Sequence, residues 1–330
     1  MSQTLISPPA VNRNLALDLV RVTEAAAMAA GRWVGRGDKN GADQAAVNAM
    51  RTMLRTVPID GVIVIGEGEK DDAPMLFNGE RVGDGTGPAC DVAVDPIDGT
   101  TLISKGMPGS VAVLAVSPGG SMFNPTDVFY MDKLVTSGEV AGHVDIEAPV
   151  ADNVRAVARA KGMLPEDVTV CMLDRTRHDR LKADVRASGA RLRLISDGDV
   201  VGALMAASEG TGVDLLLGIG GTPEGVITAC AVKCLGGVMQ GRLAPQRPQE
   251  AERAAAAGHD LTRVFTTDDL VGGEDAFFAL TGITNGELVA GVRYTGRTAV
   301  TESLVMRSRS GTVRTVRAVH RRDRNPAAVG

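Results

Sequence analysis

The chain has 330 residues, of which 44% are apolar and 40 are glycine, and its formal net charge is -5. This length allows a large buried core and favours two lobes over one, while the apolar content argues against disorder. The acidic balance gives no general reason to bind nucleic acid, and no segment approaches the ~20 consecutive apolar residues of a membrane span.

The N-terminus and the cysteines indicate where the protein works. The segment MSQTLISPPA contains neither a basic region nor an apolar run, so it does not support a signal peptide, and we expect a cytoplasmic protein. Four cysteines lie in apolar surroundings without a CxxC pair: Cys90, Cys171, Cys230 and Cys234. This pattern predicts buried free thiols rather than a zinc site or a disulfide framework.

Two helices are predicted before the first strand. Apolar residues keep helical spacing from Asn12 to Ala30, and Gly31 ends the run. After the loop GRGDKNGAD, which contains Lys39, a second helix is predicted to begin near Asp43, because an aspartate there is most often an N-cap. The first predicted strand, Val62 to Ile65, then runs directly into a group of carboxylates: Glu67, Glu69, Asp71 and Asp72.

The stretch DVAVDPIDGTT, from Asp91 to Thr101, combines a short strand with groups that bind a cation and a phosphate. Asp95 and Asp98 are hard oxygen ligands, and the proline between them stiffens the turn. Gly99 lets the backbone approach an anion closely, and a helix that starts near Thr100 would face that anion with unpaired N–H groups. The structural alternative is a strand end followed by an Asx-type turn.

Further strands are predicted from Ser110 to Val116 and at 168–174, 191–197 and 213–221, while the segment FNPTDVFYMDKL, which contains Tyr130, is predicted as helix or loop. Helical stretches of the length that βαβ crossovers need separate the last three strands, which predicts a parallel sheet. The strand ends DRTRH, SDGD and GIGGTPEG then meet at one edge, where such sheets bind ligands.

Two C-terminal patterns suggest other binding functions. GIGGTPEG is similar to a dinucleotide fingerprint, but its Pro-Glu pair replaces the spacing that the fingerprint requires. The segment from Glu250 to His259 predicts a short polar helix, and the segment from Phe277 to His320 predicts strands with a Ser-Gly turn. Arginines from Arg293 to Arg324 suit a nucleic-acid patch, but the acidic net charge favours arginines on the solvated face of strands.

Five carboxylates stand at the ends of predicted elements rather than on solvent faces: Asp43, Glu67, Asp95, Asp98 and Glu224. Carboxylates ~4 Å apart repel by roughly 4 kcal/mol per pair at an effective dielectric of about 20, so a cluster requires cations or protonation. Oxygen-only ligands favour Mg²⁺ or Mn²⁺ over zinc. If the ends of these elements converge, the sequence predicts a metal site.

A positive region follows the predicted strand at 168–174. Arg175 and Arg177 lie beside His178, and Lys39 adds a further cation from the first loop. Such a group suits a phosphate distant from the carboxylates, and ordinary basic surface residues are the structural alternative.

These residues resemble a known family. DPIDGTT after a strand is similar to the motif of the lithium-sensitive, metal-dependent sugar and inositol phosphatases. With GDKNGAD, VIGEGE, FYMDKL, LDRTRH, LISDGDV and GIGGTPEG, the chain resembles the class II (GlpX-type) fructose-1,6-bisphosphatases, roughly from Asn12 to His320. The resemblance implies a layered α/β/α/β/α sugar-phosphatase fold with two lobes. A metal- and phosphate-binding lobe would span 1–150, and a sugar-phosphate-binding lobe on a parallel-type sheet would span 151–330, with an option that the C-terminal strands return to the first lobe.

The resemblance also implies a reaction and its residues. The expected reaction is hydrolysis of the 1-phosphate of fructose 1,6-bisphosphate in gluconeogenesis, with fructose 6-phosphate and inorganic phosphate as products. Divalent metals would polarise the phosphoryl oxygens, activate water and stabilise the leaving alkoxide. The implied catalytic positions are Thr100, Lys39, Asp95 and Glu67, and the implied metal positions are Asp43, Glu67, Asp95, Asp98 and Glu224. The implied substrate positions are Gly99, Thr100, Thr101, Tyr130, Arg175, Arg177, Asp197, Asp199 and Gly221.

Two residues depart from the family pattern. Asp98 stands where some members have Glu, which shortens that ligand, and Asn285 occupies a position that we expect to be acidic in close relatives. Related phosphatases that act on sedoheptulose 1,7-bisphosphate (alone or as a second substrate), on inositol phosphate or on a 3′-phosphonucleotide remain alternatives. The pair Arg175 and Arg177 favours a bisphosphate among these.

A different class of alternative is a non-catalytic protein that binds a metabolite or nucleic acid through the glycine-rich turns or the C-terminal arginines. The retained carboxylates at Asp95 and Glu224 argue against it. We expect a homo-oligomer, dimer or tetramer, that takes a small sugar bisphosphate and has no nucleic-acid or membrane partner.

Overall fold

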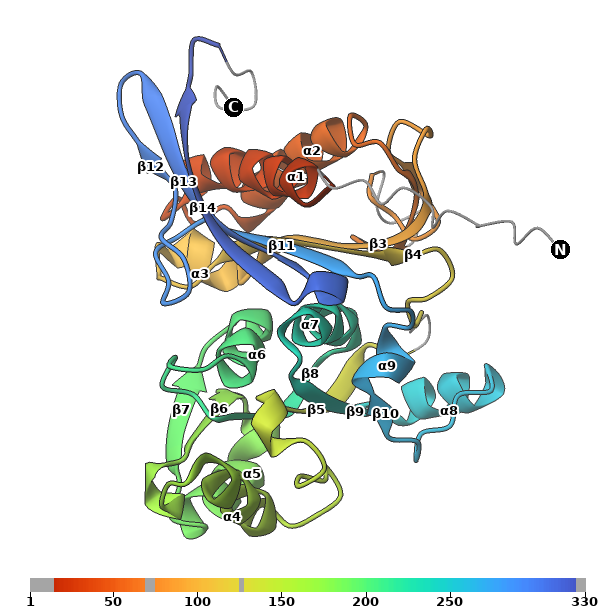
Figure 1. The fold of residues 1–330 in the computed structure, drawn as a ribbon, viewed down its shortest axis with the longest axis vertical. Coiled ribbons are helices and arrows are strands. Elements are labelled where there is room, and N and C mark those ends of the chain that lie inside the picture. The colour runs from red at the N-terminus through yellow and green to blue at the C-terminus, as the bar shows by residue number, and fades with distance from the viewer. Residues whose placement is uncertain (1–14, 69–74, 125–127, 325–330) are drawn as a thin grey trace, which may run out of the picture.

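The computed structural model describes residues 15–68, 75–124 and 128–324. Two β-sheets alternate with layers of helices, which gives the described chain an α/β/α/β/α arrangement (Figure 1). The layered α/β fold expected from the sequence is thereby confirmed. The predicted helix start at Asn12 and three predicted carboxylates lie outside the described residues: Glu69, Asp71 and Asp72.

The first sheet is built from both ends of the chain. Its strand order is β12-β13-β11-β4-β3-β1-β2, with β14 paired to β13. The pair β1 and β3 is parallel, and the other pairs are antiparallel. The bounds are β1 Asp60–Ile65, β2 Arg81–Val82, β3 Ala89–Asp98, β4 Val111–Pro118, β11 Phe277–Gly282, β12 Arg293–Tyr294, β13 Thr298–Arg307 and β14 Thr312–Arg321.

The second sheet has the order β10-β9-β5-β8-β6-β7. The predicted parallel arrangement is confirmed for β7, β6 and β8, whereas β5 runs antiparallel to both β8 and β9. The bounds are β5 Tyr130–Thr136, β6 Thr169–Leu173, β7 Arg191–Ile195, β8 Leu215–Gly221, β9 Val238–Leu243 and β10 Phe265–Thr266. The chain enters this sheet at β5 and returns to the first sheet at β11, and the division into lobes near residue 150 stays a prediction.

The prediction of helix or loop around Tyr130 was wrong, because this residue begins strand β5. The sequence YMDKLVT interrupts its apolar run with Asp132 and Lys133, which made the strand hard to recognise. Lys133 is nevertheless buried, because an ion pair with Asp199 satisfies its charge.

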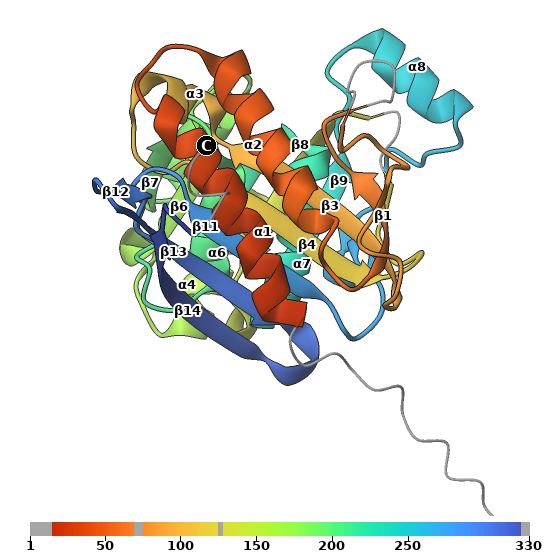
Figure 2. The same ribbon diagram turned by 90° about the horizontal axis from the view of Figure 1, so that it is seen from above.

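Helices cover both sheets and fill the space between them (Figures 1 and 2). Helices α1 and α2 cover the outer face of the first sheet, α6 and α7 lie between the sheets, and α4 and α5 cover the second sheet. Helix α8 lies to one side, beyond β9 and β10. The bounds are α1 Leu15–Ala30, α2 Lys39–Leu54, α3 Thr100–Lys105, α4 Val150–Lys161, α5 Asp179–Ala187, α6 Asp199–Ala207, α7 Thr222–Leu235, α8 Pro248–Ala256 and α9 Thr267–Leu270.

Helix α2 begins earlier than predicted. Its N-cap is Asp38, whose side chain accepts the backbone N–H of Gly41 at 2.9 Å. Asp43 is therefore inside the helix rather than at its cap, and Lys39 is its first residue rather than part of a loop. Any larger side chain at Gly41 would collide with Trp33 and with the capping carboxylate, so the glycine permits this start.

The core is apolar on both sides of each sheet. Helix α7 is buried around most of its circumference, because it packs between the two sheets. Buried clusters also lie between α1, α2 and the first sheet, and between α4 and the second sheet. The four cysteines are buried and free, as predicted. None of the described helices is both long enough and apolar enough to span a lipid bilayer.

Candidate active site

A cavity of about 280 Å³ lies where elements of both sheets meet. All five carboxylates predicted to bind metal line it: Asp43 from α2, Glu67 after β1, Asp95 and Asp98 at the end of β3, and Glu224 in the first turn of α7. Three predicted substrate residues line it as well: Gly99, Thr100 and Asp197. Side chains separated by up to 181 positions in the chain, from Asp43 to Glu224, thus line one cavity.

The topology of the first sheet explains why the carboxylates meet. Strands β1 and β3 are parallel neighbours, so Glu67, just after β1, and Asp95, near the end of β3, lie on the same edge of the sheet. The pairing of β3 with β4 shifts register between Asp95 and Asp98, which marks a bulge at the proline. Gly99 then adopts φ 89°, a left-handed conformation that favours glycine, and α3 begins at Thr100 as predicted.

The Asx-type turn that was the structural alternative is also present. The Asp95 side chain accepts the backbone N–H of Ile97 at 3.0 Å. This bond uses one carboxylate oxygen, Oδ1, and the Asp95 side chain still lines the cavity. The turn and a ligand role for Asp95 are therefore compatible.

Burial and mutual repulsion make the ionised cluster unfavourable without a positive charge. Burial raises the pKa of Glu67 to about 7, and the negative charge of Asp43 adds to the rise. Burial likewise raises the pKa values of Asp95 and Asp98 well above their usual range, with nearby carboxylates adding to both. The pKa values of Asp43 and Glu224 move in the same direction, mainly through burial.

Two carboxylate oxygens indicate where a cation fits. Among the described residues, Asp98 Oδ2 and Glu224 Oε2 are buried and have no hydrogen-bond partner. No group of three acidic, histidine or cysteine side chains in the described part of the chain converges closely enough to form a finished metal site. Like charges that line one cavity repel one another, so this spacing and the orphaned oxygens both fit a site that contracts around a cation.

A chain of polar contacts leads from the cavity to its rim. Lys39 Nζ donates to Thr101 Oγ1 at 3.0 Å, and the Thr101 backbone N–H donates to Asp197 Oδ2 at 3.0 Å. Arg175 donates to Asp197 Oδ1 at 3.4 Å and to the Ser196 carbonyl at 2.7 Å. The structure therefore connects Lys39, Thr101 and Arg175 to the cavity through Asp197, although none of the three lines it.

The remaining predicted substrate residues lie at the end of the second sheet. The Arg177 guanidinium is 5.0 Å from the centre of the Tyr130 ring and donates to the Ile219 carbonyl at 2.7 Å. Tyr130 lies opposite Gly221 in the β5–β8 ladder. Asp199 differs from the rest, because its carboxylate is turned inward and is bonded to Lys133 at 2.8 Å.

Sequence reasoning missed Lys133. Its side chain is only 1% exposed, and its positive charge lowers the pKa values of Asp98 and Glu224 against the effect of burial. The residue supplies a fixed positive charge next to the carboxylate cavity. The signal was its place in FYMDKL, one of the motifs that carry the family resemblance.

His178 was noted in sequence only as a neighbour of the arginines. Its Nε2 accepts the backbone N–H of Ile219 at 2.8 Å, so Nδ1 carries the proton and donates to the Leu173 carbonyl at 2.8 Å. Burial lowers the pKa of the imidazole, which favours this neutral form. The ring fixes the ends of β6 and β8 together, and with them the carbonyl that holds Arg177.

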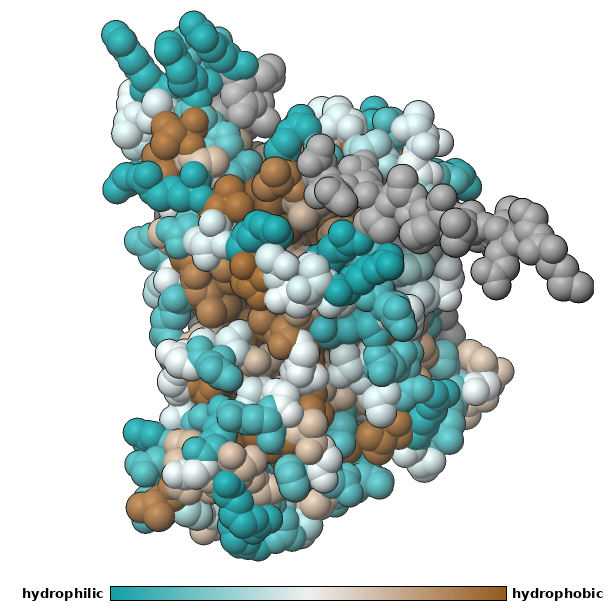
Figure 3. Space-filling model, viewed as in Figure 1, coloured by the Kyte–Doolittle hydropathy of each residue, from teal (hydrophilic) through white to brown (hydrophobic). Residues whose placement is uncertain are grey.

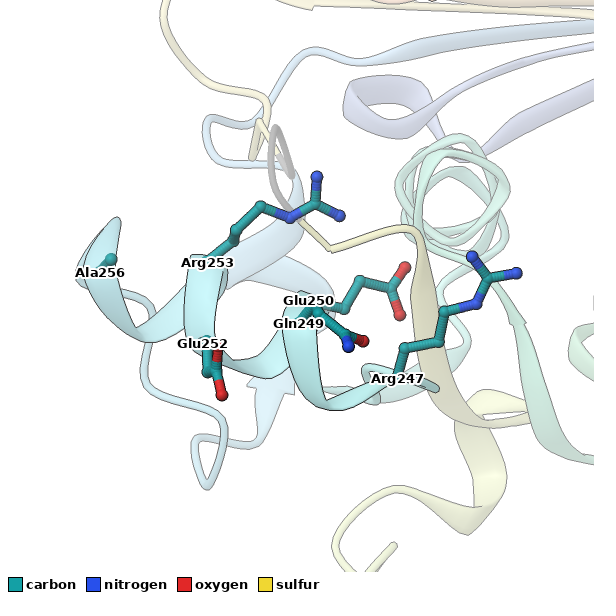
Figure 4. A pocket seen from close by; sticks show the side chains of 6 residues that line it. All are labelled: Arg247, Gln249, Glu250, Glu252, Arg253 and Ala256. Atoms are coloured by element: carbon teal, nitrogen blue, oxygen red, sulfur yellow. The ribbon is translucent and has the colours of Figure 1, made fainter.

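Two other cavities contain few of the predicted residues. One of about 600 Å³ lies along α8, where Figure 4 shows Arg247, Arg253 and Glu250 projecting from the helix, and it includes no predicted site residue. Another, of about 510 Å³, shares Asp197 with the acidic cavity and is lined in part by Gly198 and Asn285. Neither gathers a cluster of carboxylates, so the acidic cavity is the stronger candidate for chemistry.

Comparisons with known proteins agree with the motif pattern. The family model described as "Bacterial fructose-1,6-bisphosphatase, glpX-encoded" matches residues 13–320. The chain is 43% identical over 327 residues to "Fructose-1,6-bisphosphatase 1 class 2" of Escherichia coli strain K12, covering 95% of this chain and 97% of the relative. The same values hold for "Fructose-1,6-bisphosphatase class 2" of Shigella flexneri.

Proposed function

The chain belongs to the family of bacterial GlpX-type, class II fructose-1,6-bisphosphatases, and from this premise we propose that its acidic cavity hydrolyses fructose 1,6-bisphosphate. The products are fructose 6-phosphate and inorganic phosphate, so the phosphate removed is that at position 1. The observation that carries the proposal is the meeting of five buried or half-buried carboxylates with Thr100 in one cavity.

The donor set fits Mg²⁺ or Mn²⁺. The carboxylates Asp43, Glu67, Asp95, Asp98 and Glu224 offer oxygen alone, and the orphaned oxygens of Asp98 and Glu224 are the first candidates for contact. When bound, the cation supplies a Lewis acid that polarises the phosphoryl group and increases the acidity of water. Asp98 has a shorter side chain than the Glu of some family members, and it is only 4% exposed where it lines the cavity.

The chain's own residues bind and orient the reacting phosphate. Thr100 Oγ1 orients the attacking water, while the carboxylates of Glu67 and Asp95 bind the cation. Lys39 Nζ lies at the rim of the cavity, where it donates to Thr101 Oγ1. When substrate binds, the lysine breaks this bond and neutralises the charge of a phosphoryl oxygen. No cysteine or histidine is among the described residues that line the cavity, so direct attack by water requires no covalent intermediate.

The second phosphate and the sugar bind at the ends of the second sheet. Arg175 and Arg177 provide the positive charge for the 6-phosphate, and Tyr130 keeps the Arg177 side chain in place. Gly99, Thr101, Asp197, Asp199 and Gly221 complete the substrate-binding set. A site with two separate positive regions fits a bisphosphate better than an inositol monophosphate.

A phosphate-release assay tests the proposal. The panel contains fructose 1,6-bisphosphate, sedoheptulose 1,7-bisphosphate, fructose 1-phosphate, inositol phosphate and a 3′-phosphonucleotide, each with and without Mg²⁺ or Mn²⁺. We expect the largest kcat/KM for fructose 1,6-bisphosphate. A larger value for sedoheptulose 1,7-bisphosphate, equal values for monophosphates, or no activity with any substrate would each contradict this assignment.

The proposed setting follows from the reaction. Removal of a phosphate from fructose 1,6-bisphosphate is a step of gluconeogenesis, and we propose that the protein performs it in the cytoplasm as a homo-oligomer. Cell fractionation and sedimentation of the purified chain test these two points separately from the chemistry.

A further inference from the structure

The lining of the acidic cavity contains no basic side chain among the described residues. Six acidic side chains line it: Asp43, Glu67, Asp95, Asp98, Asp197 and Glu224. A positive charge lies in the interior next to this cavity, on Lys133 of β5, whose side chain is 1% exposed. Its Nζ donates to Asp199 Oδ2, in the first turn of α6, at 2.8 Å. Because both partners are buried, the ion pair belongs to the interior rather than to the surface.

Glycines leave the space that this ion pair occupies. A Cβ atom at Gly220 would lie 3.0 Å from Lys133 Nζ, and one at Gly225 would lie 3.3 Å from Lys133 Cε. A Cβ atom at Gly221 would collide with Glu224 Oε2. The ammonium group and the Glu224 carboxylate therefore pack against neighbouring residues at the end of β8, where larger side chains do not fit.

Lys133 and its partner act on the same two carboxylates with opposite sign. The positive charge of Lys133 lowers the pKa values of Asp98 and Glu224, whereas the negative charge of Asp199 raises them. Asp98 and Glu224 are also the residues with an orphaned, buried oxygen. The field of the ion pair therefore reaches the two groups that are the first candidates for contact with a cation.

We propose that Lys133 is a positioning residue that sets the affinity of the acidic cavity for divalent cations, in balance with Asp199. The inference rests on the metal site of the proposed function. Water screens a buried charge much less than an exposed one, and a divalent ion interacts with each fixed charge twice as strongly as a monovalent ion. The lysine therefore lowers the affinity that the six carboxylates would otherwise have, and Asp199 offsets part of this effect.

A purely structural role for the ion pair makes a different prediction. If Lys133 and Asp199 only join β5 to α6, removal of either partner loosens the same contact, and cation binding weakens in both cases. If the charges act on the cavity, removal of the two partners changes the affinity in opposite directions. The sign of the change, rather than its size, separates the two roles.

Titration of the metal-free full chain with Mn²⁺ in a calorimeter, without substrate, tests the inference. Asp199→Asn leaves the lysine uncompensated and should raise the dissociation constant for Mn²⁺ by roughly tenfold or more. The double variant K133M/D199N should reverse this rise, because it removes the positive charge as well. Lys133→Met alone should bind Mn²⁺ more tightly than the wild type. This variant leaves Asp199 as an unpaired buried charge, so if it does not fold, the comparison of Asp199→Asn with the double variant decides the question.

The matched control is Lys161→Met, which removes a positive charge of a second ion pair of low exposure. Lys161 Nζ donates to Asp214 Oδ1 at 3.0 Å, and the two side chains are 12% and 15% exposed. Asp214 precedes β8, roughly 20 Å from Gly220 at ~3.3 Å per residue, which exceeds the ~10 Å Debye length in 0.1 M salt. Lys161 belongs to α4, on the outer side of the second sheet, where Figure 3 shows many hydrophilic side chains at the surface. We expect its dissociation constant for Mn²⁺ to stay within about twofold of the wild-type value.

Two results would overturn the role of Lys133. One is an equal dissociation constant for Asp199→Asn and the double variant, and the other is weaker Mn²⁺ binding whenever Lys133 is removed. The titration is independent of the sugar phosphate assay. The expected order of dissociation constants in a protein that hydrolyses none of the sugar phosphates would support this inference and contradict the proposed function. An active phosphatase whose variants all bind Mn²⁺ equally would do the reverse.

Discussion

The carboxylate of Asp197 accepts the backbone N–H of Thr101 at 3.0 Å, which ties the loop after β7 to the first turn of α3. The same carboxylate accepts a hydrogen bond from Arg175, so one side chain connects the turn after β3 with the cationic edge of the second sheet. Its negative charge fixes both partners in orientation before any substrate arrives.

Asp197→Asn removes this charge and keeps the shape. We expect the KM for fructose 1,6-bisphosphate to rise by roughly tenfold or more with a smaller change in kcat, because charge-assisted hydrogen bonds to Thr101 and Arg175 are weakened. Steady-state kinetics measure both constants. Asp174→Asn is the control, since Asp174 is an exposed carboxylate bonded to Lys182 and should leave KM as it is. Equal effects of the two variants would contradict the role of Asp197.

Thr100 is expected to act through its hydroxyl. Thr100→Ala should lower kcat by roughly 10²- to 10⁴-fold, the range for a positioned proton-transfer group, with little change in KM, while Thr100→Ser keeps much of the rate. Kinetics and the melting temperature are measured on the same two variants. A near-normal kcat combined with a lowered melting temperature in the Ala variant would assign Thr100 to the start of α3 alone.

Arg177 is expected to bind the distant phosphate. Arg177→Ala should raise the KM for fructose 1,6-bisphosphate far more than it lowers kcat, because contacts remote from the reacting centre contribute mainly uniform binding. The control is Arg180→Ala, since Arg180 is an exposed residue that forms an ion pair with Asp184 across one helical turn. An unchanged KM in the Arg177 variant would place this side chain outside the substrate site.

Removal of divalent cations should abolish activity. The five cavity carboxylates have raised pKa values and two orphaned oxygens, so a cation is expected to be required both for binding and for the reaction. Exhaustive chelation followed by addition of Mg²⁺ or Mn²⁺ tests this, with phosphate release and the melting temperature as readouts. Inhibition by lithium is expected from the superfamily motif, with sodium at the same concentration as the control. Full activity after chelation would contradict the metal site.

His178 should make stability depend on pH. Its folded-state pKa is lowered below the ordinary 6.5, chiefly by burial, so the unfolded chain binds a proton more readily than the folded one. The stabilisation it gives is present above pH 6.5 and is lost as the pH falls through that value toward the folded pKa. Melting temperatures of the wild type and His178→Gln, measured from pH 8 to pH 5, should therefore converge in acid. A constant difference between the two proteins would contradict this prediction.

Local sequence carried much of the candidate site. The carboxylates Glu67, Asp95 and Asp98 stand at strand ends in short motifs, and the parallel pairing of β1 and β3 is enough to bring them together. Asp43 was placed in the cavity although its predicted role as a helix cap was wrong. Asp38 caps α2 instead, and the first turn of the helix begins before the residue that the sequence favoured.

Ion pairs between residues far apart in the chain could not be predicted from local sequence. Lys133 and Asp199 form their bond across 66 positions, and a lysine with almost no exposed surface contradicts what its residue type predicts alone. The same pair explains why Tyr130 was not recognised as the start of a strand. Only the complete fold shows that a buried carboxylate compensates the charge inside β5.

The order of strands in the first sheet has a consequence for synthesis on the ribosome. Strand β4 pairs with β11, which begins at Phe277. During synthesis, one edge of β4 therefore has no partner strand until most of the protein has been made. β4 is buried along nearly its whole length in the folded protein, and such an edge invites pairing with other nascent chains. We therefore expect the nascent chain to depend on chaperones more than a protein whose strands pair in sequence order. We also expect a slow folding step in which β11 pairs with β4.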